Sequence, residues 1–499
     1  MTKGPTWSRR LVGSGLTLLV AFGAACGTPT RSSSSTSPPP LPAAAPPAPI
    51  SWSTCAGNPG LQCGSVSVPI DYQHPGGSTL DVAVSRAVAL DPAQRIGTLV
   101  FNPGGPGESG IQILPVVLGS LPAAVRQRFD VVSFDPRGTG ASDPLECGTS
   151  PSTVTSLIPV PSSPSQPLPG TAVFTAMAKA CLTRFPHLAP FINSTNTARD
   201  MDRIREALGD PTISFYGLSY GTVLGTVYAQ LFPHRIRSMV LDGAVDINAT
   251  LTQQAVQQAA AAESSLDHFL GTCGGVTPCP LGSDPVGFFH AVDRLLAPAV
   301  TPGVADPTVT VGDLDTATLL ALSVPAFTSS YLEALVAAHN GNGAPLRALA
   351  LEFVTDIDGA SLVDSLWAIT CNDAGSHPGP AAAGSLARRL AAAYPLIGGY
   401  AATYALGGCV SWPLPSEPVV GVRPAGAPPT LVVGNTGDPN TPLVGARHLA
   451  AVFPSARQLT WNGWGHTWLL SGPQDSCMQQ HITTYFLDGT LPAPGTVCG

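Results

Sequence analysis

Apolar residues follow two periodicities in this chain, and each predicts a different kind of element. Short continuous or alternating apolar runs are typical of strands. They occur at 66–70, 80–89, 97–101, 131–134, 213–216, 236–241, 430–433 and 458–462. Apolar residues with helical spacing lie between or after these runs. These segments are 197–208, 446–453, 475–487 and one that ends near Leu231. This alternation of strand and helix predicts an α/β fold with a mostly parallel sheet flanked by helices.

One long segment departs from the alternation. From 246 to 410 the apolar spacing is helical, with candidate helices at 251–270, 286–296, 329–339, 345–354 and 362–370. Roughly 165 residues are far too many for a connecting loop. We therefore expect 51–245 and 411–499 to form two parts of one α/β core, with 246–410 as a mainly helical insertion.

The first 50 residues are typical of an export segment. Basic residues within the first ten precede an apolar run at 11–25 that is short for a membrane span, as in a signal peptide. The run ends in Gly-Ala-Ala-Cys, which resembles a bacterial lipoprotein cleavage site, so we expect 1–26 to be the signal segment and Cys26 the lipid anchor. Because Gly23 stands where Leu is usual, plain cleavage and secretion is the alternative. Residues 27–50 form a Ser/Pro/Ala-rich linker.

Cysteine usage agrees with export to the cell envelope or the medium. The chain has 11 cysteines, and once Cys26 is assigned to the anchor an even number remains, which predicts disulfides. Pairing of sequence neighbours closes short loops, although connectivity does not follow from sequence. These pairs are Cys55–Cys63, Cys147–Cys181, Cys273–Cys279, Cys371–Cys409 and Cys477–Cys498. No C-x-x-C pair is present, and we expect no metal ion and no cofactor.

The candidate nucleophile lies where the strand at 213–216 meets the following helix. Gly217-Leu218-Ser219-Tyr220-Gly221 matches G-x-S-x-G, the pattern of a nucleophile elbow. The glycines let strand and helix approach closely while Ser219 takes a strained backbone conformation. Chance matches are frequent in a chain so rich in Gly and Ser, so a base and an acid must support the assignment.

Asp438 and His466 supply those groups in the order that such elbows require, Ser, Asp and then His. Each follows a predicted strand, so both belong to the sheet edge where ligands bind. A single Asp before Pro is usually a turn residue, and a single His is usually structural. The positions of Asp438 and His466 taken together favour a catalytic role for both over a structural one. Asp242, at the end of another strand, is the alternative acid, for which we favour a structural role.

The developing oxyanion needs fixed backbone N–H donors. The candidates are the Tyr220 amide and the loop Asn102-Pro103-Gly104-Gly105-Pro106-Gly107, with Gly104 and Gly105 as its donors. This loop lacks the Lys-Ser/Thr ending of a phosphate-binding loop. Glu108 follows directly, and we expect it either to face outward or to bind a cationic group.

Charge argues against a nucleic-acid partner. The formal net charge is −8, and no run of Lys or Arg follows residue 10. The hydrophobic content of 44% is typical of a globular chain with a large core. Asp135 and Arg137, in the segment S-F-D-P-R-G-T-G, are expected to form a buried structural pair beside the site.

Together these motifs resemble the tripeptidyl aminopeptidase group of secreted α/β-hydrolases, within the wider proline iminopeptidase-like serine peptidases. The resemblance covers 52–498 and rests on V-P-I-D-Y at 68–72 with H-P at 74–75, N-P-G-G-P-G at 102–107, D-P-R-G at 135–138, R-D-M-D at 199–202, the elbow at 217–221, A-I-T-C-N-D at 368–373, and the loops of Asp438 and His466. It implies a helical cap over the site, a peptide or protein substrate, and release of short peptides such as tripeptides from free N-termini through an acyl-enzyme on Ser219. The chain departs from the group at Glu108, where a small residue is common.

An exopeptidase must bind the α-ammonium group of its substrate, which calls for a carboxylate at a fixed distance from Ser219. Asp373 and Glu108 are the candidates. Two other functions stay open. One is a secreted esterase or lipase on the same fold, because the triad acts on esters as well as amides. The other is a surface binding module that has lost catalysis. The natural substrate and the oligomeric state do not follow from the sequence.

Overall fold

The computed structural model describes residues 45–157, 166–296, 309–355, 362–415 and 417–499. The predicted signal peptide, Cys26 and most of the predicted linker lie outside these ranges. Within them, no helix is both long enough and apolar enough to cross a bilayer.

A single sheet of ten strands runs through the described chain in the order β1-β2-β3-β5-β4-β6-β7-β8-β9-β10. The strands are β1 (Ser53–Cys55), β2 (Asn58–Pro69), β3 (Thr79–Ala87), β4 (Gly97–Asn102), β5 (Phe129–Phe134), β6 (Ile213–Leu218), β7 (Ile236–Asp242), β8 (Thr430–Gly437), β9 (Ala456–Trp464) and β10 (Val497–Cys498). Pairing is antiparallel from β1 to β5 and parallel from β5 through β10. The predicted fold class is therefore confirmed, and each predicted strand is present.

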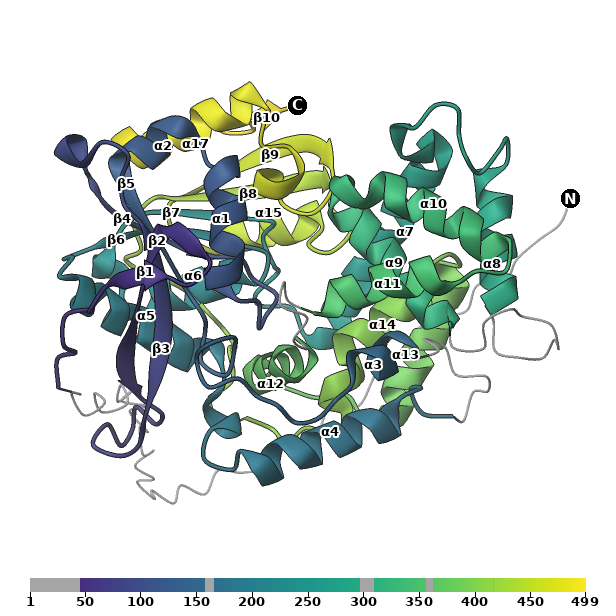
Figure 1. The fold of residues 1–499 in the computed structure, drawn as a ribbon, viewed down its shortest axis with the longest axis horizontal. Coiled ribbons are helices and arrows are strands. Elements are labelled where there is room, and N and C mark those ends of the chain that lie inside the picture. The colour runs from purple at the N-terminus through teal and green to yellow at the C-terminus, as the bar shows by residue number, and fades with distance from the viewer. Residues whose placement is uncertain (1–44, 158–165, 297–308, 356–361, 416) are drawn as a thin grey trace, which may run out of the picture. The chain divides into compact units, whose positions relative to one another are not determined.

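Helices cover both faces of the sheet because alternate strand residues point to opposite sides (Figure 1). Phe215 and Met239 pack with α5 (Ser194–Leu208), α6 (Gly221–Leu231) and α15 (Leu443–Val452) on one side. Tyr216 and Val240 pack with α1 (Gly110–Ser120), α2 (Ala123–Arg128) and α17 (Ser476–Asp488) on the other. Burial on both faces explains why the central strands are continuous apolar runs in the sequence.

The segment between β7 and β8 is helical. It holds α7 (Leu251–Thr272), α8 (Pro285–Leu296), α9 (Val311–Ser323), α10 (Thr328–His339), α11 (Ala344–Val354), α12 (Val363–Asp373), α13 (Pro380–Ala393), α14 (Gly398–Leu406) and the 3-10 helix η6 (Gly407–Ser411). Helices are confirmed at all five positions predicted there. The predictions did not include α9, α13 or α14, and the residues of α9 from Gly312 to Ser323 are all buried. A helix without a polar face has no amphipathic period to detect.

The helical part also draws on residues that precede β6. α4 (Thr171–Arg184) packs against η6 and α12, although it belongs to the stretch expected to be the first part of the core. Phe174 on α4 and Trp367 on α12 meet edge to face, with ring centroids 5.7 Å apart. The helical layer beside the sheet is therefore built from two separate stretches of sequence.

Arg137 is a buried structural residue, as expected, but its partner differs from the predicted one. Its guanidinium binds both carboxylate oxygens of Asp200 on α5, at 2.7 and 2.6 Å, and both side chains are fully buried. Asp135 instead accepts hydrogen bonds at the start of α1, from Ser109 Oγ at 2.6 Å and from the Ile111 N–H at 3.1 Å. Asp135 and Arg137 of the D-P-R-G motif therefore bind two different helices, α1 and α5.

We predict that Arg137→Met lowers the free energy of unfolding by about 3–5 kcal/mol, because it leaves the Asp200 carboxylate buried without its counter-charge. Urea unfolding followed by tryptophan fluorescence, with the disulfides intact, measures the difference. Arg389→Met, at an exposed position of α13, is the matched control and should change stability little. Equal stability of the two variants would contradict the structural role of the pair.

Candidate active site

Ser219 stands at a sharp turn between β6 and α6. Its backbone has φ = 53°, a left-handed conformation that is strained for a residue other than glycine. A Cβ on Gly217 would lie 2.4 Å from the Gly221 carbonyl oxygen, so strand and helix approach too closely for any side chain there. The Ser219 N–H donates to the Asp242 carbonyl at 2.8 Å. These features are those of a nucleophile elbow.

Asp438 lies in the turn that follows β8, and its side chain is fully buried. Oδ1 accepts the backbone N–H groups of Asn440 at 2.9 Å and Thr441 at 2.8 Å, while Oδ2 accepts the Thr441 hydroxyl at 3.0 Å. These bonds hold the carboxylate in one orientation.

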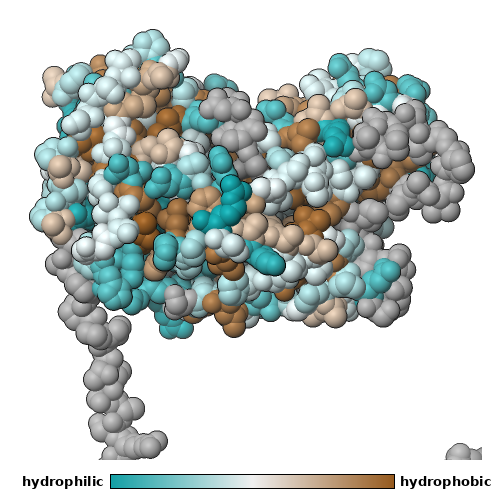
Figure 2. Space-filling model, turned by 60° about the horizontal axis from the view of Figure 1, so that its bottom comes forward, coloured by the Kyte–Doolittle hydropathy of each residue, from teal (hydrophilic) through white to brown (hydrophobic). Residues whose placement is uncertain are grey.

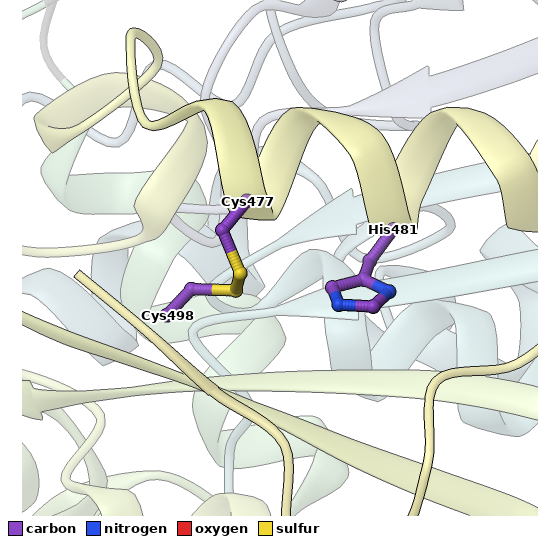
Figure 3. Close-up of side chains that lie close together, drawn as sticks. All are labelled: Cys477, His481 and Cys498. Atoms are coloured by element: carbon purple, nitrogen blue, oxygen red, sulfur yellow. A yellow bond between two sulfur atoms is a disulfide. The ribbon is translucent and has the colours of Figure 1, made fainter.

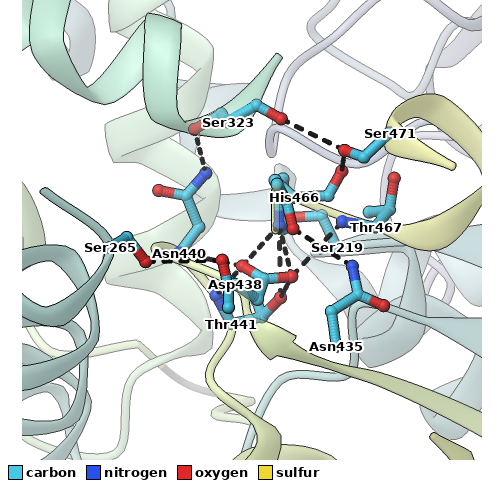
Figure 4. Close-up of polar contacts among 12 residues, drawn as sticks. Ser219, Ser265, Ser323, Asn435, Asp438, Asn440, Thr441, His466, Thr467 and Ser471 are labelled. Atoms are coloured by element: carbon cyan, nitrogen blue, oxygen red, sulfur yellow. Dashed lines mark hydrogen bonds and ion pairs between the residues drawn. The ribbon is translucent and has the colours of Figure 1, made fainter. Parts of the chain in front are cut away.

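His466 lies in the Gly-rich loop after β9, with Nδ1 at 2.9 and 3.0 Å from the two Asp438 oxygens (Figure 4). A carboxylate facing Nδ1 selects the tautomer with the proton on Nδ1, which leaves Nε2 free to accept another proton. Burial lowers the pKa of His466, but the charge of Asp438 and its hydrogen bond outweigh burial and raise the pKa above the ordinary 6.5. No hydrogen bond joins the described side chains of Ser219 and His466, a contact that commonly tightens on substrate binding.

The helical part holds the His466 loop directly. The His466 N–H donates to the carbonyl of Ser323, the last residue of α9, at 2.9 Å. Asn440 Nδ2 donates to Ser323 Oγ at 2.8 Å, so the same serine also binds the turn of Asp438. Sequence reasoning missed Ser323, because nothing local distinguishes it from the other serines of the chain.

Asp242, the alternative acid, holds a different part of the loop. Its carboxylate accepts the N–H groups of Trp468 at 2.9 Å and Leu469 at 3.0 Å, together with the Tyr216 hydroxyl at 3.1 Å. Burial raises the pKa of Asp242 to about 6, against these hydrogen bonds. Asp242 therefore fastens the segment after His466, whereas Asp438 contacts the imidazole itself.

The Asn102–Gly107 loop packs on the elbow. A Cβ on Gly104 would lie 2.6 Å from the Leu218 carbonyl oxygen and 3.1 Å from the Tyr220 nitrogen, so only glycine fits. The Gly104 N–H already donates to Asn102 Oδ1 at 3.2 Å, whereas Gly105 lines the cavity that contains Ser219. Of the two predicted glycine donors, the geometry therefore favours Gly105 alongside the Tyr220 amide.

Asp373, at the C-terminal end of α12, binds the N-terminal end of α5. Its Oδ1 accepts the Ser194 N–H at 2.8 Å and its Oδ2 accepts the Ser194 hydroxyl at 2.5 Å. The same hydroxyl lies 2.5 Å from the Tyr220 hydroxyl. Burial raises the pKa of Asp373 to about 7, although the Ser194 hydrogen bonds oppose the shift. Sequence reasoning missed Ser194, because α5 begins there, with Asn193 as its cap, and not at residue 197.

One cavity of about 660 Å³ is lined by Ser219, His466, Glu108 and Asp373. Its wall comes partly from the core and partly from the helices, including the aromatic side chains of Phe174, Phe353, Trp367, Tyr400 and Tyr404. Such a volume accommodates a small peptide or a drug-sized ligand. On the molecular face shown in Figure 2, apolar and polar residues are interspersed.

The cysteine sulfurs are bonded in the neighbour pairs proposed from the sequence. The pairs are Cys55–Cys63, Cys147–Cys181, Cys273–Cys279, Cys371–Cys409 and Cys477–Cys498. Two groups of side chains within the described ranges are compact enough to share a metal ion, one around Cys477, His481 and Cys498 and one around Cys147, Cys181 and Asp364. In both groups the cysteines are disulfide-bonded, so neither offers the thiolates that bind metals. Figure 3 shows the Cys477–Cys498 disulfide beside His481.

Comparison with known proteins agrees with this geometry. The model of the alpha/beta hydrolase fold family matches residues 97–473. The chain is 33% identical to "Serine protease Hip1" of Mycobacterium tuberculosis over 90% of its length and 91% of that protein. It is 33% identical to "Carboxylesterase B" of the same species, over 88% of this chain and 86% of that one. It is 29% identical to "Tripeptidyl aminopeptidase" of Streptomyces lividans, over 90% and 86%. With its parallel sheet and nucleophile elbow, the chain belongs to the α/β-hydrolase family.

Proposed function

We propose that the protein is an exported serine peptidase in which Ser219 is the nucleophile, His466 the general base and Asp438 the residue that orients it. The observation that carries this proposal is that His466, bound by the buried Asp438, lines the same cavity as a serine at a strained elbow. The names of two relatives, a serine protease and a tripeptidyl aminopeptidase, support peptides as substrates.

The chemistry follows from these positions. Ser219 Oγ attacks the scissile carbonyl while Nε2 of His466 takes its proton, and the oxyanion receives hydrogen bonds from the N–H groups of Tyr220 and Gly105. The imidazolium then gives its proton to the leaving amine, which leaves an acyl-enzyme on Ser219. Water then attacks the ester while His466 takes its proton, and the imidazolium returns a proton to Ser219 Oγ as the acyl peptide leaves. Asp438 stabilises the imidazolium throughout without taking the proton.

The finer part of the proposal is an aminopeptidase that releases short peptides, such as tripeptides, from free N-termini. The helices between β7 and β8 would act as a cap, since they supply much of the cavity wall. Of the carboxylates that line the cavity, Glu108 or Asp373 would bind the α-ammonium group. Export rests on the N-terminal segment, with either a lipid anchor at Cys26 or secretion after cleavage.

Comparison of free and N-acetylated tripeptide p-nitroanilides tests the aminopeptidase assignment. We predict that acetylation lowers kcat/KM about 10- to 100-fold, because it removes a charged hydrogen bond to a carboxylate in the cavity. Dipeptide and tetrapeptide series with the same leaving group show which length is preferred. Equal rates on free and acetylated substrates would exclude the exopeptidase assignment.

An esterase is the second candidate, favoured by the relative named carboxylesterase and by the many apolar side chains of the cavity wall. The triad performs both reactions, so the structure of the elbow does not separate them. Parallel kinetics on peptide anilides and on acyl esters of similar size distinguish the two. A peptidase is expected to cleave both, and an esterase only the esters.

A further inference from the structure

Asp373 and Glu108 line the same cavity as Ser219, and their carboxylates differ in their partners. Both oxygens of Asp373 are already bound by Ser194, which continues to the Tyr220 hydroxyl. This chain of hydrogen bonds fastens α12 and α5 to the residue that follows the nucleophile. The charge of the Asp373 carboxylate is therefore compensated by hydrogen bonds within the protein, and the residue has a structural role.

Glu108 has no such compensation. Within the described part of the chain, no hydrogen bond and no ion pair reaches its carboxylate, although the residue is half-buried in the cavity wall. Burial raises the pKa of Glu108 to about 7, and only the nearby His466 charge opposes the shift. A carboxylate that is partly shielded from water and has no partner in the protein carries a desolvation cost. A cationic ligand would remove that cost.

The other ionisable groups of the cavity also favour a cationic ligand. Besides His466, its ionisable lining groups are the carboxylates of Glu108, Asp373 and the exposed Glu352 together with tyrosine hydroxyls, and no Lys or Arg is among the lining residues that the structure describes. Such a wall attracts ammonium and guanidinium groups and repels carboxylates. Substrates with a free carboxylate near the scissile bond are therefore disfavoured.

Aromatic rings line the same cavity as Glu108. The charge of Glu108 acts on Tyr404, which packs against Tyr400 with ring centroids 5.9 Å apart and against Trp367 at 6.3 Å. All three rings line the cavity. Aromatic faces combined with a carboxylate are a recurrent arrangement for binding organic cations. A Cβ on Gly105 would lie 3.3 Å from the Glu108 Cβ, so Glu108 packs against the loop that holds the candidate oxyanion donor.

We propose that Glu108, with the aromatic wall around Tyr404, binds a primary ammonium or guanidinium group of the substrate close to the scissile carbonyl, and that Asp373 does not. This inference rests on the proposed hydrolase function of Ser219 and names its substrate class. The cation is either the α-ammonium group of a short acyl peptide or a Lys or Arg side chain. Both present the same chemistry to Glu108.

The test compares wild type, Glu108→Gln and Asp373→Asn in the full chain on matched substrate pairs. One pair is Ala-Ala-Ala-p-nitroanilide with its N-acetyl form, and the other is N-acetyl-Ala-Ala-Lys-p-nitroanilide with the nearly isosteric Met compound. Active sites are counted by fluorophosphonate labelling, so that misfolded protein does not enter the rates. We expect Glu108→Gln to reduce the preference for the cationic member of a pair about 10- to 100-fold. Asp373→Asn should lower both members of each pair by the same factor.

If Glu108→Gln loses the preference for the cationic substrate only in the first pair, Glu108 binds the α-ammonium group. If it loses the preference only in the second pair, Glu108 binds the Lys or Arg side chain. Either result supports the site. The proposal is overturned if Glu108→Gln lowers the rate on all substrates by the same factor. It is also overturned if only Asp373→Asn loses the preference for the cationic member of a pair. The p-nitrophenyl esters of glycine and of acetic acid form a third pair, one cationic and one neutral. If esters are cleaved and peptides are not, the peptidase proposal fails, and this third pair still decides the role of Glu108.

Discussion

Ser219→Ala lowers kcat on the order of 10⁵- to 10⁶-fold and abolishes fluorophosphonate labelling, while the protein stays folded; this is the largest effect expected. The reason is that the covalent route disappears, and only binding and the oxyanion donors still act on the substrate. The fold is expected to persist because the hydroxyl oxygen makes no hydrogen bond within the described chain. Hydrolysis kinetics, probe labelling and thermal unfolding are measured on the same preparations.

Ser376→Ala is the matched control, because Ser376 lines the same cavity without belonging to the elbow. It should keep both labelling and hydrolysis. Labelling of Ser219→Ala would show that the nucleophile lies elsewhere. A wild-type protein that neither reacts with the probe nor hydrolyses any substrate would favour the binding module that has lost catalysis.

Asp438→Asn is expected to lower kcat about 10⁴-fold while the fold is kept. The Asn440 and Thr441 N–H groups bind Oδ1, so the amide oxygen of the new asparagine should stay at that position. Its NH₂ group would then replace Oδ2, which lies 3.0 Å from Nδ1 of His466. A donor at this place favours the imidazole tautomer with the proton on Nε2, which cannot accept the proton of Ser219.

Asp242→Asn provides the comparison that separates the two acids. Because Asp242 binds the backbone of Trp468 and Leu469, this variant should lose stability in urea unfolding and show a much smaller loss of kcat per active site. If Asp242→Asn were the inactive variant and Asp438→Asn the active one, the assignment of the acid would be reversed.

Local patterns were sufficient for the parts of the fold that are amphipathic or buried on both faces. The central strands appear as apolar runs because helices cover both of their sides, and the elbow appears because its glycines are required by contacts within a few residues. By contrast, α9 and most of α14 are buried all around, so neither shows a helical apolar period. Their burial depends on neighbours that are distant in sequence.

The candidate site shows the same division. Ser219, Asp438 and His466 could be proposed from the sequence because a catalytic triad restricts both the residue types and their order. The partner of Arg137 was not, since Asp200 lies on a helix 63 residues further along the chain. The choice between Gly104 and Gly105 depended on one hydrogen bond to Asn102, which no motif records.

By itself, the sequence determined the α/β class and the positions of the strands along the chain, and it supplied a candidate nucleophile with two candidate partners, because each depends on short-range periodicity or on a residue order that the chemistry requires. Only the tertiary structure decided how the site is held and what it can bind. Ser323 fastens the His466 loop, Ser194 satisfies Asp373, and Glu108 is left without a partner in the cavity wall. Those differences arise from contacts between segments more than 100 residues apart, where burial and hydrogen-bond partners are set by packing rather than by local sequence.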